Sequence, residues 1–251
     1  MRKPVIMAVT LLAAGAAVAV WYFSDRGRFT TEPETTGLGR TVAGNDLVSD
    51  HDPAVVLRFD SAFRYAGGQK FVLYGVADAE QHFFVETTAD DRLKSVYWVQ
   101  YEAYLPGKRG TYDYGDSPMR VTLDDHEFYT DTDVVEFDPD RKRRRGTDGA
   151  MARQLLAGKG YVLPHDFAYA RLVYLTDESR RKELMIIFID DLASRGWTAA
   201  ALQEGGAHAS RRAEVEKAHL DRIRDTLRVI PLGEADSVLA YPARSSSRAA
   251  R

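Results

Sequence analysis

An uncharged apolar run near the start of the chain, residues 4–23, constrains the fold more than any other feature of the sequence. As an α-helix, with a rise of about 1.5 Å per residue, this run would match the roughly 30 Å hydrocarbon core of a bilayer. Two basic residues precede it, and an aromatic pair near its far end suits a membrane interface. We therefore predict one N-terminal transmembrane helix, a signal anchor over residues 1–23, with the lipid bilayer as the partner of residues 4–23.

The charges that flank this segment predict where the rest of the chain lies. The two basic side chains and the free amino terminus favour a cytoplasmic position for the short end. The expected product is a single-pass protein of the cell inner membrane whose C-terminal domain is extracytoplasmic. Cleavage as a signal peptide after the small residues 17–19 is one alternative, and it would make the domain periplasmic or secreted. Reversed insertion is another, because arginines also follow the run at positions 26, 28 and 40.

Composition places the remainder among ordinary globular proteins, with 45% hydrophobic and 28% charged residues. The 34 basic and 37 acidic side chains give a net charge of −3, so no nucleic acid is expected as a partner. The absence of cysteine excludes a disulfide framework and cysteine-ligated zinc. Large apolar residues are sparse at both ends of the region after the anchor. We predict a flexible tether over residues 24–52, a folded domain over 53–235 and a disordered tail over 236–251.

Alternating apolar and polar residues predict antiparallel β-strands through the first half of the domain. Residues 57–65 alternate in this way, the Gly67-Gly68 pair predicts a tight hairpin after them, and the β signal continues to residue 105. Eleven aromatic residues lie between Phe59 and Tyr104, too many for one face of a sheet. Both faces of the central strands must therefore be at least partly covered.

Helix signals are concentrated late in the chain. Thr147 or Asp148 can cap a short helix, and Thr198 can cap another. Residues 210–229 carry an apolar stripe at helical spacing, and this longest helix is expected to lie across the sheet. The predicted fold is α+β: an antiparallel β meander or half-barrel covered by late helices and preceded by the transmembrane helix.

The candidate ligand-binding residues lie on the predicted strand 95–105. Its alternation places Trp98, Gln100, Glu102 and Tyr104 on one side. If this side lines a concave sheet under the late helix, it forms an aromatic wall with two orienting polar groups, which suits a small ligand. The alternative is that Trp98 and Tyr104 pack against the helix while the two polar side chains face solvent.

No established catalytic or metal-binding motif is present. The sequence lacks the nucleophile elbow, Ser-x-x-Lys, His-Glu-x-x-His and glycine-rich phosphate-binding signatures. The acidic residues of the stretch 124–140 do not have EF-hand spacing, and the basic run 141–145 that follows can neutralise them. We predict no metal site and no cofactor, and we identify no catalytic residue.

These features favour a membrane-anchored extracytoplasmic domain that binds a small apolar ligand or an envelope partner protein without catalysis. The alternative is an exported hydrolase or metal-dependent enzyme, in which His82 or His126 and several carboxylates would meet in a cleft. The two hypotheses differ in whether Glu102, His82 and His126 share one pocket.

Overall fold

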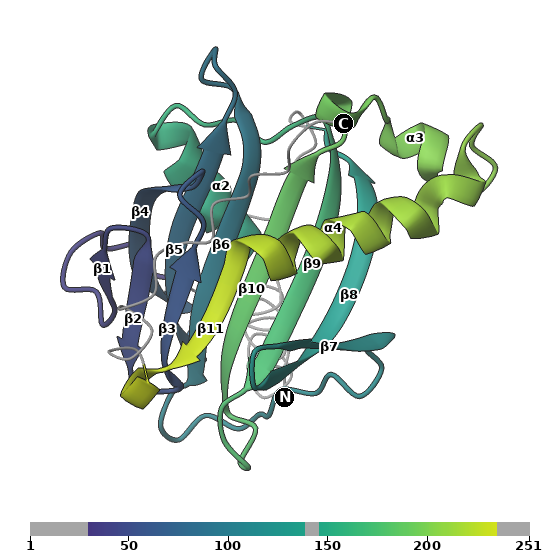
Figure 1. Cartoon of the computed structure of the whole chain (residues 1–251). Helices are drawn as coiled ribbons and strands as arrows, with labels where there is room; N and C mark the ends of the chain where they lie inside the picture. Colours follow the sequence, from purple (N-terminus) through teal and green to yellow (C-terminus); the bar gives the residue numbers. More distant parts are fainter. Residues whose placement is uncertain (1–29, 139–145, 235–251) are drawn as a thin grey trace, which may run out of the picture.

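The computed structural model describes residues 30–138 and 146–234, which form two antiparallel β-sheets and a few helices (Figure 1). The larger sheet has seven strands in the spatial order β4 (Arg64–Leu73), β5 (Ala77–Thr87), β6 (Leu93–Tyr104), β10 (Lys182–Asp191), β9 (Asp166–Leu175), β8 (His126–Glu136) and β7 (Met119–Leu123). The smaller sheet has the order β1 (Thr41–Ala43), β2 (Asp46–Asp50), β3 (Ala54–Phe59) and β11 (Leu227–Pro231). The antiparallel sheets and the late helices confirm the predicted α+β class.

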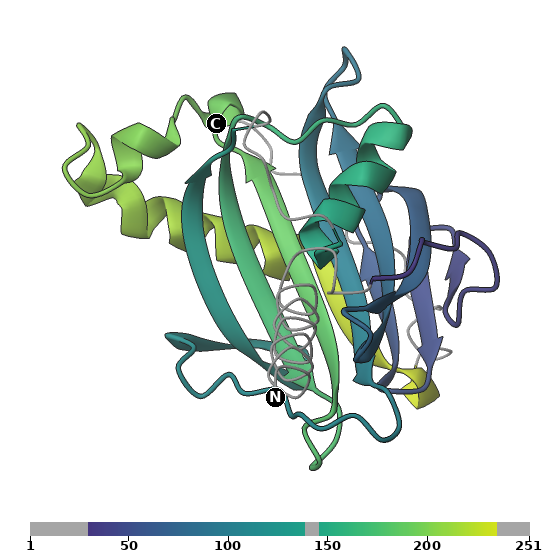
Figure 2. The same ribbon diagram turned by 180° about the vertical axis from the view of Figure 1, so that it is seen from behind.

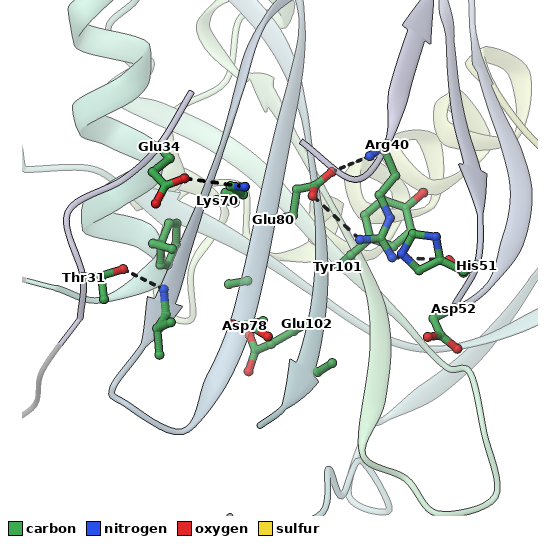
Figure 3. A pocket seen from close by; sticks show the side chains of 14 residues that line it. Thr31, Glu34, Arg40, His51, Asp52, Lys70, Asp78, Glu80, Tyr101 and Glu102 are labelled. Carbon is green, nitrogen blue, oxygen red and sulfur yellow. Dashed lines mark hydrogen bonds and ion pairs between the residues drawn. The ribbon is translucent and has the colours of Figure 1, made fainter. Parts of the chain in front are cut away.

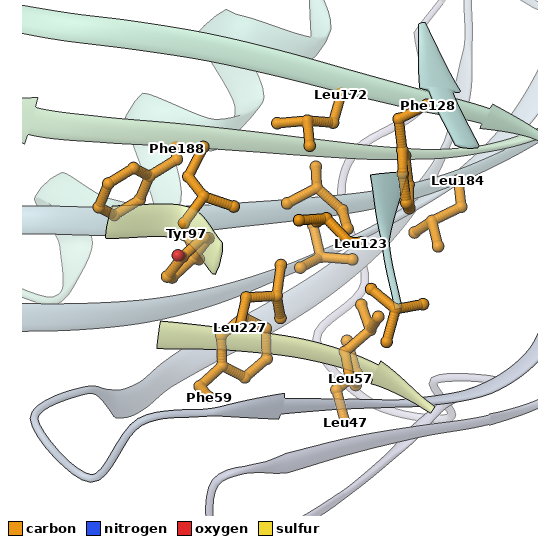
Figure 4. Close-up of a cluster of buried hydrophobic side chains, with 14 of the residues drawn as sticks. Leu47, Leu57, Phe59, Tyr97, Leu123, Phe128, Leu172, Leu184, Phe188 and Leu227 are labelled. Carbon is orange, nitrogen blue, oxygen red and sulfur yellow. The ribbon is translucent and has the colours of Figure 1, made fainter. Parts of the chain in front are cut away.

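Both faces of the larger sheet are covered, as the number of aromatic residues requires. One face packs against the smaller sheet and helix α4 (Arg212–Thr226), and the other packs against helix α2 (Asp148–Gly158) (Figures 1 and 2). Figure 4 shows the first of these cores, with Phe59 of the smaller sheet and Tyr97 of the larger one. The ring of Phe59 also stacks on that of Phe84, with 4.0 Å between the centroids, and so joins the two sheets. Neighbouring residues of β6 pack in the cores on opposite faces of the sheet: Tyr97 faces the smaller sheet, whereas Trp98 faces α2.

Residues 57–65 do not form the single strand that their alternation predicts. Strand β3 ends at Phe59, and the backbone amide of Phe63 donates to the carbonyl of Asp60 at 3.0 Å to close a turn. The chain therefore leaves the smaller sheet here and enters the larger one at β4. The side chain of Asn45 donates to the carbonyls of Asp60 and Phe63 at 2.8 and 2.9 Å, so a neighbouring strand connection holds this turn.

The Gly67-Gly68 pair lies inside β4 rather than in the predicted hairpin reversal. The register between β4 and β5 shifts between Tyr65 and Gly67, where the positive φ of 137° at Gly67 suits glycine. At Gly68, an added Cβ would lie 2.6 Å from the hydroxyl of Tyr65 and 2.8 Å from Nδ1 of His82. The two glycines allow a β-bulge and a close approach, which are further structural reasons for glycine in a strand.

Gly68→Ala is expected to lower the free energy of unfolding by about 1–3 kcal/mol, because the added methyl group overpacks a site bounded partly by backbone. The carbonyl oxygen of Gln81, 2.8 Å from the added Cβ, cannot move without disturbing the β4–β5 pairing. Urea denaturation measures the change. Gly158→Ala is the matched control, since a Cβ there meets nothing within 4 Å. Equal stability of the two variants would contradict the close packing around Gly68.

The helices begin after the capping residues that the sequence predicts, but the longest helix ends earlier than its apolar stripe predicts. Thr147 caps α2 and Thr198 caps α3 (Ala199–Leu202). Helix α4 ends at Thr226 rather than continuing to residue 229, because Leu227 begins β11 and pairs with β3. Three short 3-10 helices complete the described elements: Ala193–Arg195, Ala209–Arg211 and Leu232–Glu234.

Residues 41–50 belong to the folded domain and not to the flexible tether predicted for residues 24–52. They form β1 and β2, and the side chain of Leu47 is fully buried between the sheets. Further upstream, Glu34 forms an isolated β-bridge with Lys70 at the edge of β4. A few apolar residues are enough to order this segment, because β2 pairs with β3 through backbone hydrogen bonds and adds the large side chain of Leu47 to an existing core.

Several predictions fall outside the described residues: the transmembrane helix over residues 1–23, the first residues of the tether, the basic run 141–145 and the tail 236–251. Among residues 30–138 and 146–234, no helix has both the length and the apolar content needed to cross a bilayer.

Candidate functional site

The four candidate residues of β6 share one face of the larger sheet, as their alternation predicts, but they do not form one site. Trp98 lines an apolar pocket, and Glu102 lines a separate polar pocket. Gln100 is fully buried and lines neither of these pockets. Tyr104 also lies outside both, where its ring contacts the ring of Tyr112 at 4.7 Å.

The apolar pocket lies between α2 and the larger sheet and has a volume of about 480 Å³. Small-molecule sites usually have volumes of about 300–1,000 Å³ and mostly apolar walls. Apolar and aromatic side chains make up most of this wall: Phe83, Val96, Trp98, Val135, Phe137, Ala152, Leu156, Leu163, Phe167, Tyr169 and Ile189. Size and lining therefore both suit a small, largely apolar molecule.

The pocket is covered by α2, not by the late helix that the sequence places over this face. Helix α4 packs on the opposite face, where Leu220 and Ile223 join the core that contains Tyr97. Because β11 follows α4 directly and pairs with β3, the helix is held on the side of the smaller sheet. The apolar residues of α2 that face the pocket are Ala152 and Leu156.

Trp98 is half-buried in the pocket wall, and its ring nitrogen has no hydrogen-bond partner among the described residues. The Nε1 atom itself is buried. The ring packs near Phe83, with 6.1 Å between the ring centroids. On the helix side, Gly149 leaves space beside the indole: an added Cβ would lie 3.9 Å from Cη2 of Trp98, an ordinary van der Waals contact.

Charged residues line part of the same pocket, and ion pairs neutralise three of them: Asp131, Asp133 and Arg171. Arg171 donates to Oδ2 of Asp131 through Nε at 3.0 Å, from one strand to the next. Asp133 accepts from the guanidinium of Arg212 at 2.9 Å. With Arg153, the lining holds two acidic and two basic side chains. The pocket therefore has no net charge that would select an ion.

A row of hydrogen-bonded amide side chains runs beside the pocket across β4, β5 and β6. Gln69 donates to Gln81 at 2.7 Å, Gln81 donates to Gln100 at 2.8 Å, and Gln100 donates to Glu102 at 2.8 Å. The other carboxylate oxygen of Glu102 accepts from the hydroxyl of Tyr112 at 2.7 Å. Burial raises the pKa of Glu102 above its usual range, although these two hydrogen bonds act against the rise.

Glu102 faces a second buried carboxylate, which sequence reasoning missed. Glu183 is its direct cross-strand partner on β10 and is 3% exposed. The hydroxyl of Tyr114 donates to Glu183 at 2.7 Å, as Tyr112 does to Glu102. Burial, followed by the charge of Glu102, raises the pKa of Glu183 to about 8. Two carboxylates on neighbouring strands thus favour binding a proton at neutral pH.

The polar pocket has a volume of about 520 Å³ and lies where residues 31–52 meet β4, β5 and β6 (Figure 3). Its charged side chains largely neutralise one another. Figure 3 shows Lys70 beside Glu34, 3.5 Å apart, and Arg40 beside Glu80. The guanidinium of Arg40 also lies 4.0 Å from the ring centroid of Tyr101. This hollow has fewer features of a ligand site than the apolar pocket, because most of its polar groups already have partners.

The histidines proposed for an enzyme do not meet Glu102. His82 is fully buried, contacts Glu80 at 2.8 Å and Tyr65 at 3.1 Å, and faces the smaller sheet. His126 begins β8, where its ring packs edge-on against Tyr174. Among residues 30–138 and 146–234, no cluster of three or more His, Asp or Glu side chains has the arrangement of a metal site.

The acidic stretch 124–140 finds partners on distant strands and helices. Asp124 accepts from Nε of Arg228 at 2.6 Å, and the Asp131 and Asp133 pairs tie β8 to β9 and α4. Tertiary pairing therefore neutralises these three acidic residues, whereas the basic run 141–145, to which the sequence assigns this role, lies outside the described residues. Of these acidic residues, Asp131 and Asp133 line the apolar pocket.

Several pocket residues were not singled out from the sequence. Phe167, Tyr169 and Arg171 line the pocket at alternating positions of β9. This alternation could have been found in the sequence. Phe137 and Leu163 carry no comparable local signal, since they lie outside regular elements.

Comparison of the chain with protein-family models, with curated proteins and with solved structures finds no match.

Proposed function

We propose that this domain binds a small, largely apolar molecule in the apolar pocket between α2 and the larger sheet, without catalysing a reaction. The observation that carries the proposal is the pocket itself: about 480 Å³, walled mainly by apolar and aromatic side chains, with charges that are balanced. Such a site excludes water from an apolar ligand and gains free energy in proportion to the apolar surface that both partners bury.

The surface favours a small ligand over an envelope partner protein. Protein-binding surfaces usually contain a contiguous exposed apolar patch. In the part of the chain that the structure describes, Val162 is the large hydrophobic residue that stands exposed, at 68%. A single side chain is too little for such a patch, whereas the pocket offers concave apolar surface.

The arrangement of polar groups supports binding over hydrolysis. An enzyme with His82, His126 and Glu102 in one cleft would need them on the same face of the sheet, and these side chains lie apart. The Glu102–Glu183 pair is enclosed by two tyrosines that hydrogen-bond to it. The proposal retains the expected anchoring by residues 4–23, which would hold the pocket near a bilayer, where apolar molecules partition.

Filling the pocket tests the proposal. Gly149→Leu places an isobutyl group beside Trp98 without backbone strain, because its Cβ meets its neighbours at 3.9 Å. We expect this change to weaken binding of a neutral fluorescent naphthylamine probe by about tenfold or more, equivalent to about 1.4 kcal/mol. Fluorescence titration of the full chain measures the affinity, and circular dichroism checks that the variant is folded.

The matched control is Gly158→Leu, the same substitution on the same helix at a position where a Cβ meets nothing within 4 Å. Its affinity for the probe should stay within about twofold of the wild type, since a tenfold change requires about 1.4 kcal/mol and Gly158 does not line the pocket. If both folded variants bind the probe equally well, or if the wild type does not bind it, the proposed function is wrong.

A further inference from the structure

The floor of the apolar pocket changes from apolar to polar across the sheet. Residues that lie directly opposite one another on neighbouring strands point to the same face, so the strand register orders the pocket residues into rows. One row, from β6 to β8, consists of Val96, Ile189, Tyr169 and Asp133. Its members on β6 and β10 are aliphatic, its member on β9 has a hydroxyl group, and its member on β8 has a carboxylate.

A second row repeats this order from β5 to β8. It consists of Phe83, Trp98, Ile187, Arg171 and Asp131, of which all but Ile187 line the pocket. Neighbouring strands lie about 4.8 Å apart, so the two rows span about 14 and 19 Å. The floor is therefore long enough for an alkyl chain that lies across the strands with a polar group at one end.

Burial follows the same order as polarity. Phe83 and Val96 are 0% and 1% exposed, whereas the side chains of Asp131 and Asp133 are 27% and 56% exposed. Helix α2 lies over the side of this face that β5 and β6 form (Figure 2). A polar group at the β8 end keeps its contact with water, whereas burial of the same group under α2 would cost free energy.

The polar residues of the lining have no net charge together. They are two aspartates, two arginines, a threonine and a tyrosine: Asp131, Asp133, Arg153, Arg171, Thr132 and Tyr169. A head group with a full charge of either sign would meet one side chain of like charge for each side chain of opposite charge. A head group without net charge can hydrogen-bond to both kinds.

Resting on the proposed function, we infer that the ligand is a single-chain amphiphile whose head group has no net charge. Its alkyl chain lies across the strands under α2, and its head group lies beside Asp133 and Arg171 at the β8–β9 end of the pocket. This orientation removes the chain from water and leaves the head group in contact with it.

Two ions of opposite charge, decanoate and decyltrimethylammonium, test the position of the head group as competitors of the naphthylamine probe. In Asp133→Asn, the ratio of decanoate affinity to decyltrimethylammonium affinity should rise about fivefold or more, because a negative charge beside the head group is removed. The amide oxygen can still accept from the backbone amide of Val134, as the carboxylate does at 2.8 Å. Arg171→Gln removes a positive charge and should lower the same ratio by a similar factor.

Glu136→Gln is the matched control. It removes a negative charge from an exposed position of the same strand that does not line the pocket, and it should leave the ratio within about twofold of the wild type. In the wild type, decyldimethylamine oxide, which has the same chain length and no net charge at pH 7, should compete better than either ion.

A measurement on the wild-type chain tests the direction of the ligand. Trp98 belongs to the apolar end of its row, so ω-bromodecanoate, with bromine at the chain end, should quench Trp98 fluorescence more than α-bromodecanoate, with bromine beside the head group. The difference should disappear in Trp98→Phe.

If the ratio responds to neither Asp133→Asn nor Arg171→Gln and the two bromodecanoates quench equally, the inference is overturned, while loss of probe binding in Gly149→Leu still supports the proposed function. If either ion competes better than decyldimethylamine oxide in the wild type, the inferred neutrality of the head group is wrong. If the wild type binds neither the probe nor any of these amphiphiles, the proposed function itself is wrong.

Discussion

A chain that begins at residue 51 is expected to fail to fold, whereas a chain that begins at residue 30 is expected to unfold in one cooperative transition. Truncation at residue 51 removes β1 and β2, including the fully buried Leu47, and leaves β3 with β11 as its one remaining partner strand. It also removes Asn45, which holds the turn that carries the chain from one sheet to the other. Such losses approach the whole stability of a typical domain, about 5–15 kcal/mol.

Near-ultraviolet circular dichroism and urea denaturation measure the outcome. In the full chain, Leu47→Ala should lower the free energy of unfolding by about 2–5 kcal/mol, the usual cost of truncating a buried leucine. Thr41→Ala, at an exposed position of β1, serves as the control and should change stability by less than about 0.5 kcal/mol. A chain from residue 51 with fixed tertiary signals would show that β1 and β2 are dispensable.

The same segment shows why composition misplaced the start of the domain. Residues 24–52 hold few large apolar side chains, which is typical of a tether when the segment must fold by itself. Here β2 has a preformed edge to pair with, and the ion pair between Asp46 and Arg58, at 2.8 Å, links the two strands. When distant residues supply most of the core on which a strand packs, the strand's own sequence contains few apolar residues that would identify it.

Local rules succeeded where the determining contacts are local. Thr147 and Thr198 cap helices as predicted, and the alternation of β6 places Trp98 and Tyr97 on opposite faces. The rules failed where tertiary pairing decides. The apolar stripe of α4 continues in the sequence through Leu227, which predicts a longer helix. Leu227 is instead the first residue of β11, because it pairs with β3.

The candidate site also has features that local sequence patterns predict and features that depend on tertiary contacts. Alternation could predict that Trp98 lies on a partly covered face, but not that α2 would cover it, because no local pattern relates two segments so far apart in sequence. A carboxylate on such a face needs a hydrogen-bond donor or solvent. The donors to Glu102 are Tyr112 and Gln100, and the alternation of one strand does not identify them. The partner carboxylate, Glu183, depends on the β6–β10 register, which only the folded sheet defines.

That carboxylate pair predicts an unusual dependence of stability on pH. The pKa of Glu183 is raised to about 8 in the folded chain, above the value of 4.5 for an unperturbed glutamate. Between these two pH values the folded state holds a proton that the unfolded state has lost. The contribution of Glu183 to stability is therefore fully present below pH 4.5 and decreases as the pH rises, by at most about 1.4 kcal/mol per pH unit, until it levels off above pH 8.

Glu183→Gln is expected to remove this decrease and to make the protein more stable than the wild type at pH 8, by about 1–4 kcal/mol, the range observed when buried ionic groups are replaced. The amide cannot ionise, and its oxygen can still accept from the hydroxyl of Tyr114. At pH 5, where folded wild type carries the proton, the two chains should differ by less than about 1 kcal/mol. Urea denaturation across this pH range gives the difference between the two curves, which cancels the titration of most other groups.

Glu178→Gln, the same substitution at an exposed position, should follow the wild type throughout. If Glu183→Gln follows the wild type as well, Glu183 is ionised in the folded chain at neutral pH, and its carboxylate must be stabilised by more than the hydrogen bond from Tyr114.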